Sequence, residues 1–492
     1  GWIEWPLIKG VSQEQVLFSV DGILSNIESD KIIRNRNIVS DSLALKASDE
    51  KLSIFGKSKI DNFPIEFSWM QNLKNNSDRM STVDAKFYIN QNGLDTFNVL
   101  LPEGMFSGNT QGNLRLSLRP KKPAKFLMSS NLKGAEININ SLGWSNKSIK
   151  NGNLNIRGSL STPLDINEIR ILADDLNANG KVNFDNDSKF KSAVFPEINV
   201  ADWFSTSLTV SKTDSESLME LDGGVVDFRK LVFGKSDDTE VGLLNVSLDS
   251  LRISEGIEFT NFSTNIDFSQ KELGNFKAQI NGGANIYGKL SKGEFGTIIT
   301  LNGDDAGHVL RSAGILDNIR GGKLNLVLTP NEKNGYYTGR FITNKFRMLH
   351  SNPIALLLDS LSLVGLVDKL ETEGIQFNQA KGWLNITPEG IQLRDVSLVG
   401  VSMGMSITGW YDKKKKAINF DGVITPVYAI NGVFERLAGK LFGEQKGEGL
   451  FSFVYTMKGP TSSPNVKVKP LSILTPGGFR KIFRSDIPAP SK

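Results

Sequence analysis

The most informative stretch of the sequence is Gly447–Pro476, which reads GEGLFSFVYTMKGPTSSPNVKVKPLSILTP. Its first half alternates strictly, and one face of the strand it would form carries Phe451, Phe453, Tyr455 and Met457. This period of two predicts a strand with one buried face and one face that can meet water. Gly459-Pro460 would end that strand. A second short strand would run as far as Pro470, because proline cannot donate a hydrogen bond to a sheet.

The same alternation recurs along the chain. Apolar residues spaced two apart occur near residues 51–57, 63–69, 113–119, 134–140 and 152–158, and again near 276–280 and 324–328. Each run predicts a half-buried strand of an antiparallel sheet. The residues expected on the apolar face are Leu114, Leu116, Leu118, Ile137, Ile139, Leu154, Ile156, Leu324, Leu326, Phe451, Phe453 and Tyr455.

Six dipeptides of the Asn-Gly or Asp-Gly type punctuate these runs. Both residue types tolerate the positive φ that tight hairpins require, so each dipeptide predicts a hairpin turn. They are Asn92-Gly93, Asn151-Gly152, Asn179-Gly180, Asp222-Gly223, Asn281-Gly282 and Asn302-Gly303. The strands and turns together predict a mainly β protein in which successive strands form an antiparallel meander.

A long amphipathic sheet has to cover its apolar face. A barrel or a two-sheet sandwich would divide the chain into discrete domains joined by linkers. No proline-rich or low-complexity linker occurs between Gly1 and Pro470. We therefore expect an elongated antiparallel sheet curled into a repeating β-groove, with a few short helices near the C-terminus. The alternating residues by themselves would equally suit the closed core of a sandwich.

Helical periodicity predicts helices at residues 304–319, 353–370 and 427–442, and a short amphipathic piece at 479–483. Two of these segments have an apolar stripe that would either form a lid on the groove or contact a membrane. The stripe residues are Ile354, Leu358, Leu361, Phe479 and Phe483.

These patterns divide the chain into three regions. A repetitive groove region would span residues 1–303, a region with helices would span 304–487, and a disordered tail would span 488–492.

The composition excludes several classes of protein. The net charge of the 492 residues is only +4 and is scattered, whereas nucleic-acid binding needs a focused basic patch. The absence of cysteine rules out disulfides and thiolate chemistry, and two histidines make a multi-histidine metal site or a catalytic triad improbable. No run of eighteen apolar residues occurs. Because the chain begins at Gly1 rather than at Met, we expect that a signal or membrane anchor could lie upstream.

Four features could carry chemistry, and each has a simpler structural explanation. Gly400–Gly404 matches the G-x-S-x-G nucleophile pattern, but a strand-like run follows it where an active nucleophile needs a helix. His308 suits a surface or capping role, and His350 suits a loop. Lys413–Lys416 would attract anionic headgroups or, more simply, form a solvated hairpin turn. We assign no catalytic residue, no metal ligand and no cofactor.

From about Thr338 onward the chain resembles the C-terminal region of the AsmA-like envelope proteins of the YhdP and TamB type. The resemblance lies in several motifs taken together. They are the helix at 353–370 with its Glu373-Gly374-Ile375 exit, the segment Val399–Gly404, the strand-to-helix junction Gly422–Asn431, and the closing stretch Gly447–Pro476. Upstream of Thr338 the chain matches only in its strand-rich character and in short pieces such as Leu221–Phe233, and the lysine run is not a feature of the family.

The resemblance implies a bridge-like lipid transfer protein of a Gram-negative periplasm, anchored to the inner membrane by an upstream segment. It implies that phospholipid is carried between the inner and outer membranes, which supports outer-membrane lipid homeostasis, with envelope membrane proteins as further partners. We expect neither enzymatic activity nor nucleic-acid binding. The alternative is a structural or adhesive β-rich envelope protein without a lipid ligand.

Overall fold

The computed structural model describes residues 1–9, 15–33, 36–74, 80–99, 101, 103–139, 144–147, 149–150, 152–187, 189–212, 217–230, 242–333, 335–426 and 452–470. Within these residues the protein is mainly β, and its few helices are short, which confirms the predicted fold class. The chain divides into two compact units, Gly1–Leu244 and Asn245–Lys492. The predicted regional boundary at 303/304 lies inside the second unit.

The elements of the first unit, in chain order, are β1 (Trp2–Glu4), β2 (Leu17–Ile33), β3 (Arg36–Ser48), β4 (Lys51–Ile60), β5 (Phe63–Asn72), β6 (Ser81–Ile89), α1 (Gln91–Thr96), β7 (Phe106–Gly108), β8 (Thr110–Arg119), β9 (Lys122–Ser130), β10 (Ala135–Ile139), β11 (Trp144–Asn146), β12 (Gly152–Ser159), β13 (Asp165–Ala173), β14 (Leu176–Phe184), β15 (Phe190–Val200), β16 (Phe204–Lys212), β17 (Ser217–Asp227) and the 3-10 helix η3 (Phe228–Lys230).

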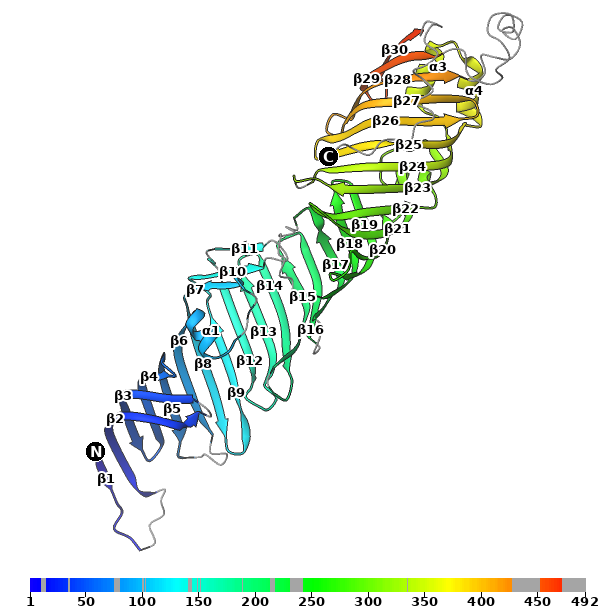
Figure 1. Cartoon of the computed structure of the whole chain (residues 1–492). Helices are drawn as coiled ribbons and strands as arrows, with labels where there is room; N and C mark the ends of the chain where they lie inside the picture. Colours follow the sequence, from blue (N-terminus) through cyan, green and yellow to red (C-terminus); the bar gives the residue numbers. More distant parts are fainter. Residues whose placement is uncertain are drawn as a thin grey trace, which may run out of the picture. The chain divides into compact units, whose positions relative to one another are not determined.

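The remaining elements are β18 (Leu243–Ser254), β19 (Ile257–Asp267), β20 (Glu272–Ile280), β21 (Asn285–Gly293), β22 (Gly296–Gly303), α2 (Ala306–Ser312), β23 (Ile319–Pro330), β24 (Tyr337–Met348), α3 (Asn352–Ser360), α4 (Val364–Thr372), β25 (Ile375–Thr387), β26 (Gly390–Gly400), β27 (Met403–Asp412), β28 (Ala417–Pro426), β29 (Phe453–Pro460) and β30 (Asn465–Pro470). Figure 1 labels most of these elements along the chain.

Neighbouring strands pair antiparallel and in chain order within each unit. In the first unit the pairing runs from β2 to β6 and then through β8, β9 and β12 to β17. In the second unit it runs without interruption from β19 to β30. The strands β7, β10 and β11 form a small separate sheet. The predicted antiparallel meander is therefore confirmed for the described strands.

In both units the insertions between strands occur at the same end of the strands. In the first unit, α1 follows β6, and the small sheet is inserted before β8 and after β9. In the second unit, α2 connects β22 to β23, and α3 and α4 connect β24 to β25. We call this the capped end of each unit. At the other end, the open end, described short turns join strands such as β8 to β9 and β27 to β28 (Figure 1).

Several of the predicted hairpin dipeptides lie elsewhere in the fold. Asn281-Gly282 forms a tight turn between β20 and β21, as predicted, with positive φ at both residues. Asn92-Gly93 lies in α1, and Asn302-Gly303 ends β22. Asn179-Gly180 and Asp222-Gly223 lie inside strands, where the register shifts at β-bulges. Bulges bend and twist strands, so these glycines shape the sheet rather than end its strands. Asn151 lies outside the described residues.

The helices differ from the predicted ones in length and number. The segment 304–319 forms only α2, which begins after the predicted cap Asp305 and is followed by Gly314 in a left-handed conformation. The segment 353–370 is two helices, α3 and α4, because Ser362 between them has a positive φ. The helix α1 was not predicted. The predicted segments 427–442 and 479–483 and the tail at 488–492 lie outside the described residues.

Candidate functional site

One face of the sheet in the first unit carries an unbroken row of apolar residues. Residues directly opposite each other in an antiparallel pair lie on the same face, so the register traces the row from strand to strand. It contains only glycine, alanine and larger apolar residues. From β2 to β17 the row is Gly22, Leu45, Ile54, Trp69, Val83, Leu116, Phe126, Gly158, Ile166, Val182, Ala193, Val210 and Met219.

The second unit has a row of the same kind. It crosses every strand from β19 to β30 and again contains only glycine and apolar residues. The row is Ile266, Gly274, Leu290, Ile299, Leu328, Gly339, Leu384, Leu393, Gly409, Phe420, Met457 and Val466. At ~4.8 Å per strand, this row extends roughly 50 Å across the sheet. We call the face that carries these two rows the apolar face of each unit.

The opposite face of the first unit is mainly polar. The adjacent residue on each strand points to this face, and the register pairs these residues in a row of their own. From β3 to β17 that row is Lys46, Ser53, Met70, Thr82, Ser117, Lys125, Ser159, Asp165, Asn183, Ser192, Ser211 and Leu218. Ion pairs cross neighbouring strands on this face, such as Arg115 with Asp84 at 2.6 Å and Arg157 with Glu168 at 3.2 Å. The sheet of the first unit is therefore amphipathic, with one face suited to water and the other to hydrocarbon.

On the apolar face, several glycines leave space that a large side chain from the neighbouring strand occupies. A Cβ atom added at Gly158 would lie 2.8 Å from the ring of Phe126 on β9, and one at Gly409 would lie 2.9 Å from the ring of Phe420 on β28. At Gly339 the added atom would lie 2.7 Å from Leu384. Each of these larger side chains covers the space that the glycine leaves, an arrangement that protects the glycine backbone.

Most of the large residues in both rows are only partly buried. Leu116, Phe126, Leu328, Leu384 and Leu393 all keep contact with solvent, although each lies in the middle of a wide sheet. In a closed sandwich or barrel the residues on the inner face are covered by a second layer, and so are mostly buried. The middle of the apolar face therefore lies open in both units.

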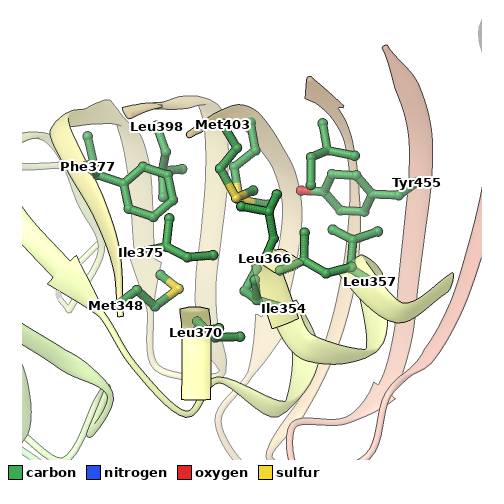
Figure 2. Close-up of a cluster of buried hydrophobic side chains, with 14 of the residues drawn as sticks. Met348, Ile354, Leu357, Leu366, Leu370, Ile375, Phe377, Leu398, Met403 and Tyr455 are labelled. Carbon is green, nitrogen blue, oxygen red and sulfur yellow. The ribbon is translucent and has the colours of Figure 1, made fainter. Parts of the chain in front are cut away.

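At the capped end of the second unit, the apolar face is fully covered. Helices α3 and α4 place Ile354, Leu357, Leu366 and Leu370 against the strands, and Figure 2 shows these side chains directed at the sheet. The covered strand residues are Met348, Ile375, Phe377, Leu398, Met403, Met405, Ile424 and Tyr455. Burial also raises the pKa of the Tyr455 hydroxyl, which stays un-ionised. The two helices therefore form a fixed lid over one end of the face.

The first unit is covered at its capped end in a similar way. At the capped end of β13 to β17, a second row contains Ala173, Leu176, Val200, Phe204 and Val226, and all five are buried. The small sheet is held at this end by the indole nitrogen of Trp144, which donates a 3.0 Å hydrogen bond to Asp175. Each unit thus has a sealed capped end and an exposed apolar surface toward the open end.

The predicted lining residues fall into three groups. Leu114, Leu116, Leu118, Leu154, Ile156, Leu326 and Phe453 are partly buried on the main strands. Ile137 and Ile139 belong to β10 of the small sheet, whereas we expected them on the main sheet, because β10 pairs with β7 and β11. Leu324 and Tyr455 are buried, the former where α2 packs on β23 and the latter in the cluster under α3. Phe451 lies outside the described residues.

Of the predicted lid residues, Ile354 and Leu358 are buried against the sheet and Leu361 is partly buried, an arrangement that favours a lid over membrane contact for this stripe. Phe479 and Phe483 lie outside the described residues. Sequence periodicity did not identify the covering role of Leu366 and Leu370, because the break at Ser362 changes the direction of the second helix.

The remaining motifs have structural roles. Ser402 is buried in a bend between β26 and β27, so a strand rather than a helix follows the G-x-S-x-G segment. The backbone N–H of His308 donates to Asp305 at the start of α2, and His350 lies in the turn before α3. Lys413–Lys416 form the predicted hairpin turn between β27 and β28.

In the part of the chain that the structure describes, no cluster of three or more His, Asp or Glu side chains is placed to hold a metal ion. Among the helices described, none combines the length and apolar character needed to cross a bilayer.

Comparisons with protein-family models, with curated proteins and with solved structures found no match to this chain. The resemblance to AsmA-like proteins therefore stays a prediction.

Proposed function

We propose that this protein is a bridge-like lipid transfer protein whose open apolar face carries the acyl chains of phospholipids. In this proposal it works in the periplasm of a Gram-negative bacterium, between the inner and outer membranes. An inner-membrane anchor and envelope partner proteins are part of the same proposal, and both derive from the AsmA-like resemblance of the segments after Thr338.

The observation that carries the proposal is the pair of unbroken apolar rows, each partly exposed across a whole unit. Burial of hydrocarbon is worth about 0.8 kcal/mol per CH₂ group, so a sixteen-carbon chain exposed to water is penalised by roughly 13 kcal/mol. A surface that covers part of the chain at every step reduces this penalty along the whole route. A row without a polar interruption has no step at which the chain would have to leave it.

The shape of the surface favours carriage over storage. A storage site would enclose the ligand in a deep pocket lined with apolar side chains. Here the apolar surface is open and lies on the face of a sheet, and only its capped end is covered. A lipid could therefore lie with its tails on the face and its headgroup in water beyond the open end, where no charged pocket is needed.

Site-specific photocrosslinking tests the proposal. A benzophenone amino acid is placed at Leu116 or Leu384 on the apolar face, and at the neighbouring positions Arg115 or Arg340 on the polar face. The protein is crosslinked in cells, and attached lipid is identified by mass spectrometry.

We expect phospholipid adducts from Leu116 and Leu384 and none from the two polar-face controls. Absence of lipid at all four positions would overturn the proposal and favour the alternative, a structural or adhesive protein without a lipid ligand.

A further inference from the structure

A basic hollow lies on the polar face of the second unit, at the capped end of β23, β24 and β25. Its volume is about 270 Å³, and its lining includes Arg320, Lys345, Arg347 and Gln376. The hollow is on the opposite face from the apolar row, because Ile319, Met348 and Ile375, the sequence neighbours of these residues, belong to the covered cluster. It is therefore separate from the surface proposed to carry acyl chains.

The two arginines are direct cross-strand partners. The register places Arg320 opposite Arg347, and Arg347 opposite Gln376. The Cβ atoms of such a pair lie about 5 Å apart, and like charges at this separation destabilise the sheet. The repulsion between the two adjacent guanidinium groups would be relieved by an anion that binds both of them.

The described carboxylates do not neutralise these cations. The Nη1 atom of Arg320 donates to the backbone carbonyl oxygens of Asp317 and Ile319, at 2.5 and 3.0 Å, and Arg347 reaches the carbonyl oxygen of Glu373 at 3.4 Å. In the described residues none of the ion pairs involves Arg320, Lys345 or Arg347.

The backbone adds space beside the arginines. Lys345 has a φ of 55°, and Gly321 and Gly322 on the neighbouring strand also have positive φ. A Cβ atom at Gly321 would have its nearest neighbour at 3.9 Å, so the strand is open at this point. The irregular pairing brings a third cation to the hollow and leaves room for a tetrahedral group between the side chains.

We propose that this hollow binds a phosphate group. The planar guanidinium group presents paired N–H donors that match two oxygens of a phosphate, and Lys345 and the amide of Gln376 supply further donors. The phosphate could belong to a phospholipid headgroup in a membrane surface or to a soluble compound. Exposed apolar residues at the same end, Ile315 and Leu316 before β23 and Val364 at the start of α4, favour the membrane surface as its source.

The test compares wild-type protein with the double variant Arg320→Gln/Arg347→Gln and with the matched control Arg252→Gln, which removes an exposed arginine of β18. One arm measures binding to vesicles of phosphatidylglycerol and phosphatidylcholine by flotation. Two arginines near an anionic surface contribute about 1 kcal/mol each, so the double variant should bind about 30-fold more weakly, while the control changes by much less.

The second arm measures the melting temperature in sodium phosphate and in sodium chloride of equal ionic strength. Phosphate should stabilise the wild type and the control more than chloride does, and should not do so for the double variant. In chloride the double variant should melt close to the wild type, because removal of the like-charge repulsion offsets the loss of the arginine hydrogen bonds to backbone carbonyls, and this melt also checks that the variant folds.

The two measurements distinguish a lipid headgroup from a soluble compound as the source of the phosphate. Loss of vesicle binding in the double variant assigns the site to a lipid headgroup. Loss of phosphate stabilisation with unchanged vesicle binding assigns it to a soluble phosphate compound. The proposal is overturned if phosphate and chloride stabilise the wild type equally and the double variant binds vesicles as the control does. None of these outcomes depends on lipid crosslinking at Leu116 or Leu384.

Discussion

The hydroxyl of Tyr455 on β29 donates a 2.6 Å hydrogen bond to the backbone carbonyl of Ser406 on β27, two strands away. The Tyr455 ring crosses the intervening strand at Gly422, where a Cβ atom would lie 2.6 Å from the Tyr455 hydroxyl oxygen. The paired register of β27 and β28 skips Ser406, whose own side-chain oxygen accepts from the N–H of Val423 at 3.0 Å. One aromatic side chain therefore joins three strands at the point where the sheet passes beneath the lid.

We expect Tyr455→Phe to destabilise the protein by about 1–2 kcal/mol, because the partly buried Ser406 carbonyl loses its donor while the ring still fills its space. Chemical denaturation monitored by tryptophan fluorescence measures this change. Tyr411→Phe, on β27, is the matched control and should cost less, since Tyr411 is only partly buried. Equal effects of the two substitutions would contradict the role given to the hydrogen bond.

We expect Gly422→Ala to cost more than about 2 kcal/mol, because the new methyl group would meet both the Tyr455 hydroxyl and the Ser406 carbonyl oxygen, and a packed core gives way only with strain. The control is Gly365→Ala in α4, where the added carbon has open space. Alanine is a better helix former than glycine by up to about 1 kcal/mol, so the control should be neutral or stabilising. Thermal denaturation should show a clearly lower melting temperature for Gly422→Ala and an unchanged or higher one for Gly365→Ala.

Truncation of the lid should be costly only on its buried side. Leu357 and Leu358 are fully buried, and changing either to alanine should cost about 2–5 kcal/mol through lost burial and the cavity left behind. Leu356, on the same helix, is 41% exposed, and Leu356→Ala should change the free energy of unfolding by less than about 1 kcal/mol. A comparable loss at Leu356 would mean that its exposed side also packs against something.

A charge on the open apolar face should block lipid without unfolding the sheet. Leu116→Asp and Leu384→Asp place a carboxylate where each row is partly exposed, so the group can stay hydrated while it makes the row unfavourable for an acyl chain. Ser117→Asp adds the same charge to the polar face of β8 and serves as the control. Co-purified phospholipid, measured by mass spectrometry, should fall several-fold in the first two variants. Unchanged lipid content in all three would count against the proposed function.

The Asp227–Arg229 pair should make stability depend on acid pH. Arg229 donates hydrogen bonds of 2.8 and 2.6 Å to the two carboxylate oxygens of Asp227, and this lowers the pKa of that carboxyl below its ordinary value of 3.8. A lowered folded-state pKa contributes stability above the unfolded pKa, and this contribution is lost as the pH falls through the folded value. Because Arg229 is 46% exposed, we expect only about 1 kcal/mol at pH 7.

Asp227→Asn should therefore be less stable than the wild type at pH 7, and the difference should shrink as the pH falls below about 4. The control is Asp202→Asn, at a carboxylate that is 85% exposed beside Lys230 and should matter little at any pH. Urea denaturation at a series of pH values measures both. A difference that persists unchanged at pH 2 would show that the asparagine acts through packing rather than through charge.

The strands were predictable because a period of two is a local property. The alternation in residues 63–69 and 113–119 places apolar side chains on one face wherever the strand goes, and β5 and β8 form there as predicted. The dipeptide signal was less reliable. Asn179-Gly180 has the composition of a turn, yet its partners on β15 hold it inside a strand as a bulge. Which of the two outcomes occurs depends on the neighbouring strand, and a local pattern contains no information about that neighbour.

The amino-acid pattern was enough to predict a mainly β, antiparallel and amphipathic chain, because side-chain alternation fixes which residues share a face. Which apolar residues are covered and which stay open could be seen only in the folded protein, because that depends on where the helices and the small sheet pack. Tyr455 and Leu116 both lie in runs of alternating apolar and polar residues. Tyr455 is covered in the cluster under α3 and α4, whereas Leu116 is partly exposed, and the residues next to Tyr455 in the sequence do not indicate this difference. The pairing of Arg320 with Arg347 likewise depends on the register of β23 against β24, which the local sequence around either arginine does not determine.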